Sequence, residues 1–189
     1  SIILASPSFL YLNEPSNADE SRQLSDRELA VRMAYFLWSG PPDEELMRVA
    51  ADRSLLDEAI LLEQTERMLS HPRAKEFYEG FISQWMHLKR FHSVGLSSRF
   101  LLHYTDGYIL SAKQEPVEFF KTLVEENLPS SNLIDSDFVT IDGLLAAKYG
   151  LTDHYTGDGF QKVSLPADSP RGGLITQGAF LAIGTMNNR

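Results

Sequence analysis

The sequence of 189 residues contains no cysteine. Disulfide bridges, thiol catalysis, zinc–thiolate sites and haem attachment through a CxxCH motif are therefore excluded for this chain. Common catalytic motifs are missing as well, since there is no HExxH pair, no GxSxG nucleophile elbow and no P-loop lysine. A catalytic site in this chain would have to be assembled from residues scattered along the sequence.

Basic residues are outnumbered, with 17 Lys and Arg against 26 Asp and Glu, which gives a formal net charge of −9. A surface of that sign repels nucleic-acid phosphates and anionic membranes. No apolar run approaches the roughly 20 residues that span a bilayer, and residues 1–5 lack the basic start of a signal peptide. Hydrophobic residues still make up 43% of the sequence, which is enough for a core without disulfides.

Signals that start and stop helices recur along the sequence. Ser25 and Glu28 have the spacing of a capping box, in which each side chain accepts a hydrogen bond from the other residue's backbone N–H. Gly150 is placed to end a later helix, whereas Pro116 predicts a kink or a break within a long one. The predicted helices run from residue 25 to Gly40-Pro41-Pro42, onward from residue 43, and over residues 57–69, 72–88, 105–127, 142–149 and 174–183.

Aromatic residues cluster in the predicted helix over residues 72–88. Phe77, Tyr78, Phe81 and Trp85 share one face there, which predicts a central stripe of the core. A weak alternation of apolar residues over 160–165 predicts a short strand. The expected fold is all-α, an irregular bundle of about six to eight helices with a long Gly- and Pro-containing loop and one short β hairpin near the C-terminus.

Histidines and acidic residues give weak metal candidates. His87 and His92 would approach one ion if the helix ended between them, but no carboxylate completes a known motif. Asp153 and Asp158 lie in a Gly-rich loop whose spacing misses the calcium-binding EF-hand pattern. We therefore expect no metal ion or other cofactor in this chain.

Two further polar segments have a structural and a functional interpretation. Asp135 and Asp137, with Asp142 close behind, fit either turn and cap chemistry or an acid–base pair, and the caps are favoured. Arg171 and the following glycine pair fit either a tight turn, with Arg171 paired to a carboxylate, or an anion site at a helix start. The tight turn is favoured, because a lone glycine pair is a weak phosphate signal.

Spaced blocks of sequence together carry a resemblance to a known family. These blocks are residues 5–11, 24–30, 35–39, 42–46, 66–74, 81–85, 137–138, 145–146, 149–150 and 171–178. As a set they resemble a family of helical domains of unknown function from large secreted cytochrome-like proteins of planctomycetes and related bacteria. One departure is Glu115-Pro116, where that family usually has a Glu-Thr-like pair. This departure is a second indication that the predicted helix over residues 105–127 is interrupted there.

The resemblance implies a domain organisation and a setting. Residues 1–12 resemble the end of a preceding module, residues 13–170 the helical domain, and residues 171–189 the truncated start of a following cytochrome-associated module. The implied location is secreted or periplasmic, with a haem c carried elsewhere in the parent protein. No catalytic residues are implied.

Three functions remain open from the sequence. The favoured one is a non-catalytic helical scaffold or interaction module that contacts neighbouring modules of the same polypeptide. The first alternative is part of an oxidoreductase whose haem is supplied by another segment. The second is a carbohydrate-binding module, and the aromatic residues considered for stacking on sugars are Trp38, Tyr104, Tyr108 and Tyr155. The sequence leaves open whether the chain is an enzyme. The lack of a catalytic motif favours the interpretation that this segment alone is not one.

Overall fold

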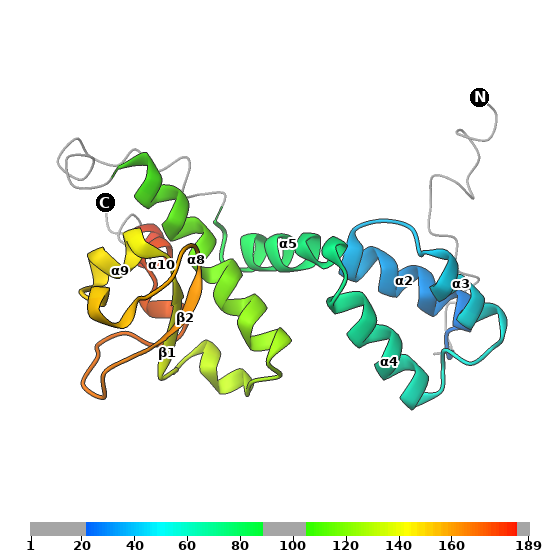
Figure 1. Cartoon of the computed structure of the whole chain (residues 1–189). Helices are drawn as coiled ribbons and strands as arrows, with labels where there is room; N and C mark the ends of the chain where they lie inside the picture. The colour runs from blue at the N-terminus through cyan, green and yellow to red at the C-terminus, as the bar shows by residue number, and fades with distance from the viewer. Residues whose placement is uncertain (1–21, 89–104, 185–189) are drawn as a thin grey trace, which may run out of the picture. The chain divides into compact units, whose positions relative to one another are not determined.

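The computed structural model describes residues 22–88 and 105–184 (Figure 1). Within these ranges the α-helices are α2 (Asp26–Trp38), α3 (Glu44–Ala51), α4 (Glu58–Leu69), α5 (Lys75–Trp85), α8 (Asp106–Glu125), α9 (Gly143–Tyr149) and α10 (Gly178–Gly184). The strands are β1 (Phe138–Ile141) and β2 (Gln161–Ser164), and the 3-10 turns are η2 (Pro72–Ala74), η3 (Ser130–Leu133), η4 (Thr152–His154) and η5 (Leu174–Thr176). The expected all-α class with one short antiparallel strand pair is confirmed.

The chain divides into two compact units at the His71-Pro72 junction, Ser1–His71 and Pro72–Arg189. The first unit contains α2, α3 and α4, and the second contains all later elements. None of the described helices is long and apolar enough to cross a membrane. The boundaries expected after residues 12 and 170 stay predictions.

Helix α2 begins with the capping box. The Ser25 hydroxyl accepts from the Glu28 N–H at 3.3 Å, and the Glu28 carboxylate accepts from the Ser25 N–H at 2.9 Å. Arg22 donates two hydrogen bonds to the same carboxylate, and together these donors lower the pKa of Glu28 to about 2. The helix ends at Ser39 in a left-handed conformation, immediately before Gly40-Pro41-Pro42.

Trp38 and Asp43 join the three helices of the first unit. The Trp38 ring is buried, and its Nε1 donates to the carbonyl oxygen of Met68 at the end of α4, at 3.0 Å. Asp43 caps α3 by accepting from the Leu46 N–H at 2.9 Å. Arg67 of α4 donates to both Asp43 oxygens, at 2.7 and 3.1 Å, and its guanidinium lies 5.6 Å from the Trp38 ring centroid. One polar cluster thus holds α2, α3 and α4 together.

Helix α8 is the central element of the second unit, and α5, α9, α10 and β1 all pack against it. It continues through Pro116, so of the two predicted alternatives the break is wrong, and the kink stays a prediction. A proline inside a helix removes one backbone hydrogen bond and crowds the preceding turn. Pro116 is fully buried here, and packing on the surrounding elements offsets that local cost.

Strand β1 is buried along its whole length and pairs antiparallel with β2, with Val139 opposite Val163. The sequence pattern predicted β2 but not β1, because a run of four residues, Phe-Val-Thr-Ile, is too short to show a period that separates strand from loop or helix. Helix α9 follows β1, beginning after the cap Asp142 and ending at Gly150 in the left-handed conformation. The strand pair and α9 bury a core against α8 that consists of Ala112, Val139, Ile141, Leu145, Ala146, Leu151 and Val163.

The aromatic face of α5 differs from the predicted buried stripe. Tyr78 is buried, but Phe81 is 39% exposed and Trp85 is 53% exposed. Tyr78 and Ile82 are the buried residues of α5, whereas Phe81, one residue before Ile82 and rotated about 100° from it, stacks on Phe120 of α8 and keeps part of its ring exposed. Trp85 is the last residue of the helix. The stripe is therefore only partly core.

Asp43→Ala tests the polar cluster of the first unit. Because the substitution removes a helix cap and leaves Arg67 without its carboxylate, we expect a loss of about 1–2 kcal/mol in the free energy of unfolding. The measurement is urea unfolding followed by Trp38 fluorescence in a Trp85→Phe background.

Asp52→Ala is the matched control. Asp52 forms an ion pair with Arg48, and both side chains of this pair are 62% exposed. Its expected cost is below about 0.5 kcal/mol. Equal costs for the two substitutions would contradict a structural role for the Asp43–Arg67 pair.

Candidate functional site

Glu115 is an ionisable residue on the buried side of α8. Its exposure is 0%, and it lies between Ala112 and Phe119, three residues after one and four before the other. Apolar side chains occupy such positions in a helix that packs against a core. A carboxyl group there needs hydrogen-bond partners from other elements, because water cannot reach it.

Tyr149 at the end of α9 supplies one of these partners. Its hydroxyl donates to Glu115 Oε2 at 2.7 Å and accepts from the Gly178 N–H at 3.2 Å. A Cβ atom at Gly178 would lie 2.9 Å from the Tyr108 hydroxyl and 3.2 Å from that of Tyr149. Only glycine lets the first residue of α10 approach this closely, so α8, α9 and α10 meet at one buried polar centre.

Arg171 contacts this centre through the ring of Tyr149. Its guanidinium carbon lies 3.5 Å from the Tyr149 ring centroid, and its Nη1 donates to the carbonyl oxygen of Thr176 at 3.1 Å. Within the described residues Arg171 forms this cation–π contact in place of the expected ion pair with a carboxylate.

The glycine pair after Arg171 packs closely on the chain that leads into β1. Gly173 has φ +68°, and a Cβ atom there would lie 2.4 Å from the carbonyl oxygen of Ile134. A side chain at this position would clash with the Ile134 backbone, so glycine is needed for the close packing. The observation agrees with the tight turn favoured from the sequence.

Burial dominates the electrostatics of Glu115. It raises the pKa of the carboxyl group to about 7, against the opposing effects of the Tyr149 hydroxyl, the nearby Gly178 N–H and the Arg171 charge, while Asp142 raises it further. Burial likewise raises the pKa of Tyr149. Among the residues that the structure describes, Glu115 Oε1 and both polar atoms of the buried Gln177 amide have no hydrogen-bond partner.

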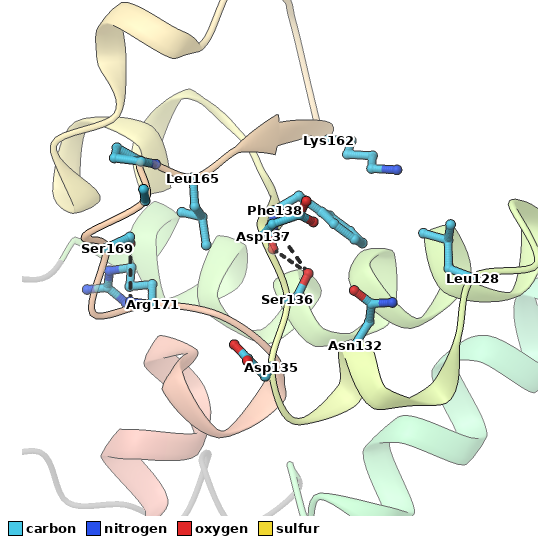
Figure 2. Close-up of a pocket in the computed structure, with 12 residues that line it drawn as sticks. Leu128, Asn132, Asp135, Ser136, Asp137, Phe138, Lys162, Leu165, Ser169 and Arg171 are labelled. Atoms are coloured by element: carbon cyan, nitrogen blue, oxygen red, sulfur yellow. Dashed lines mark hydrogen bonds between the residues drawn. The ribbon is translucent and has the colours of Figure 1, made fainter.

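An open pocket of about 720 Å³ shares Arg171 with this centre, and Figure 2 shows the residues that line it. Its walls carry the carboxylates of Asp135 and Asp137 and the guanidinium of Arg171. The Ser136 hydroxyl is used internally, because it donates to the Phe138 carbonyl oxygen at 3.0 Å and accepts from the Phe138 N–H at 3.2 Å. These walls suit hydrogen bonding to a polar solute, but Glu115 is fully buried and does not line them.

Those metal candidates that the structure describes are all exposed. His87 is exposed after the end of α5, and His92 lies outside the described residues. Asp153 and Asp158 are both exposed. In the described ranges no group of three or more His, Cys, Asp or Glu residues is arranged to hold a metal ion.

The acidic and aromatic candidates have mainly structural contacts. Asp142 caps α9 by accepting from the Leu145 N–H at 3.0 Å, and it also accepts from the Ser111 hydroxyl. Trp38 is buried in the first unit, so it is not placed to stack on a sugar. Tyr108 and Tyr155 are half-buried, and the Tyr155 hydroxyl donates to the carbonyl oxygen of Gly159 at 2.8 Å. Tyr104 lies outside the described residues.

Glu115, Tyr149 and Gln177 were not predicted as a group. One signal was present, namely an acidic residue at core spacing in a predicted helix. A second was that Tyr149, Arg171 and Gln177 all belong to the blocks that carry the family resemblance. What was missing was the spatial proximity of these blocks.

Gly178→Ala tests the close approach at the buried centre. The added methyl group must displace two tyrosine hydroxyls, so we expect a loss of about 1–3 kcal/mol in the free energy of unfolding, measured by urea titration with circular dichroism. Gly80→Ala is the matched control, because a Cβ atom in α5 at that position meets nothing within 4 Å. We expect it to leave stability unchanged or raise it by about 0.5–1 kcal/mol. A neutral Gly178→Ala would contradict the described packing.

Comparison with known proteins gives one family. The model of the PSD4 family, described as "Protein of unknown function (DUF1592)", matches residues 24–151. The matched range contains α2 to α9 and β1, and it ends before β2, η5 and α10. No match was found among curated proteins or among solved structures. Since the match covers more than half of the 189 residues, the chain belongs to the PSD4 family of proteins of unknown function (DUF1592).

Proposed function

We propose that this chain is a non-catalytic scaffold and interaction module, which contacts a neighbouring module of the same polypeptide through the aromatic surface of α5 and α8. The parent protein in this proposal is a large secreted or periplasmic cytochrome-like protein of the planctomycete type, as the sequence resemblance implies. Haem would be carried by another segment of that protein.

One observation carries the proposal, a contiguous row of four aromatic rings, here called the aromatic row. Phe81 stacks on Phe120 with 5.1 Å between ring centroids, and it lies 5.8 Å from Phe77 and 5.7 Å from Trp85. Two of these rings are substantially exposed, Phe81 at 39% and Trp85 at 53%. Contiguous aromatic patches of this kind mark interaction surfaces, because Trp and Phe lose little side-chain entropy for the area that they bury.

The use of the polar residues supports the same function. Asp43, Asp142 and Ser25 cap helices, and Glu115 lies in the buried centre. These contacts hold the fold together, whereas Phe81 and Trp85 of the aromatic row expose hydrophobic surface that contact with another module would bury.

Hydroxyl-radical footprinting with mass spectrometry tests the proposal. The oxidation rate of Trp85 is compared between the isolated 189-residue chain and the intact parent protein. Because contact with a neighbouring module excludes solvent, we expect the rate at Trp85 to fall at least several-fold in the parent protein. Tyr35 of α2, which is 57% exposed, serves as the reference and should react equally in both.

Limited proteolysis of the parent protein supplies a matched pair of variants. Phe81→Ser should speed cleavage between modules, since it removes a ring from the centre of the aromatic row. Leu62→Ser, in α4 at 58% exposure, should not. Equal oxidation of Trp85 in the isolated chain and the parent protein, with no effect of Phe81→Ser, would overturn the proposal.

A further inference from the structure

We propose that Glu115 is a pH-dependent latch, which holds the C-terminal segment, residues 171–184, on α8 and α9 while its carboxyl group carries a proton and releases the segment when the proton leaves. This inference is independent of the aromatic row.

The geometry links the carboxyl group directly to the segment. The Gly178 N–H donates to the Tyr149 hydroxyl at 3.2 Å, and that hydroxyl donates to Glu115 Oε2 at 2.7 Å. Arg171, at the start of the segment, lies over the Tyr149 ring at 3.5 Å. The segment is therefore held at both Arg171 and Gly178 by the one tyrosine that binds Glu115.

The charged and titratable groups around Glu115 come from each element packed against it. On α9 and at its cap these are Tyr149 and Asp142, on the C-terminal segment Arg171, and on α8 itself Tyr108, whose ring faces Lys148 at 5.8 Å. Arg171 and the hydrogen bond from Tyr149 favour the carboxylate, whereas burial and Asp142 favour the neutral acid. Burial has the largest effect, and it raises the pKa of Glu115 to about 7.

Ionisation creates a buried charge that is only partly solvated by the protein. Glu115 Oε1 has no donor among the described residues, and an unpaired buried charge is costly. Water can reach the carboxylate only if one of the elements that enclose it moves away. Helix α10 has seven residues, of which Phe180 and Leu181 are exposed and Ala179 and Ala182 are buried, whereas the 20-residue α8 is held by α5, β1 and α9. Release of the segment is therefore a smaller opening than unfolding of the unit.

The sign and size of the pH effect follow from linkage. The closed form holds the Glu115 proton with a pKa of about 7, whereas the open form exposes the carboxyl group, with its ordinary value of 4.5. The closed form thus binds the proton more tightly, so closure is most stable below about pH 4.5 and weakens as the pH rises through 7. Between pH 5 and pH 8 the opening equilibrium should rise on the order of 50-fold.

Amide hydrogen exchange of the 189-residue chain measures this opening directly. Protection factors of amides 172–183, corrected for the intrinsic pH dependence of exchange, should fall on the order of 50-fold from pH 5 to pH 8 in the wild type. Amides of α2 should keep constant protection. In Glu115→Gln the C-terminal segment should show no such fall, because the group that titrates is gone.

Two further variants complete the test. Glu118→Gln, one turn along α8 at a half-buried position, should retain the wild-type pH dependence. Tyr149→Phe removes the hydroxyl that links the Glu115 carboxyl group to the Gly178 N–H, so the protection of residues 172–183 should already be lower than in the wild type at pH 5. This second variant keeps the test decisive even if Glu115→Gln fails to fold. Protection of residues 172–183 that is independent of pH in the wild type, or a wild-type pH dependence in Glu115→Gln together with wild-type protection at pH 5 in Tyr149→Phe, would overturn the latch.

Discussion

A carboxyl group without access to water lies where the helices of the second unit meet. Glu115 sits on the packed face of α8, and its hydrogen bond to Tyr149 joins α8 to the end of α9. The hydroxyl of the same tyrosine accepts a hydrogen bond from the Gly178 N–H, and its ring is in cation–π contact with the Arg171 guanidinium. A buried carboxyl group is stabilising only while its neighbours supply hydrogen bonds, so α9, α10 and the Arg171 turn must keep the positions in which they satisfy it.

The first unit also contains a carboxyl group that joins several helices, but this one lies nearer to solvent. Asp43 and Arg67 are both partly exposed, and their ion pair is shared with a helix cap and the face of Trp38. Arg67 lowers the pKa of Asp43, in contrast to the raised pKa of Glu115. The difference follows from burial, because a carboxylate that keeps contact with water and a guanidinium stays charged easily, whereas one enclosed by a core does not.

The pocket and the aromatic row, both on the second unit, differ in chemistry. The pocket beside Arg171 is polar and is bordered by Asp135 and Asp137, whereas the aromatic row on α5 and α8 is apolar. Family membership extends over both units up to residue 151, but the segment that completes the buried centre lies after the matched range. The packing of Gly178 on Tyr149 shows that this later segment is structurally part of the second unit.

The fold class and most helix limits follow from local sequence patterns. Caps such as Ser25 with Glu28, and helix ends such as Gly150, act between residues that are close along the chain, so they can be identified without coordinates. The exposure of Trp85 and the passage of α8 through Pro116 depend on which helix face meets a neighbour, so they follow only from the packing of the folded chain. The same holds for the buried centre. Glu115 and Tyr149 are 34 residues apart, Tyr149 and Gly178 are 29 apart, and no local pattern links groups whose interaction exists only after the core has closed around them.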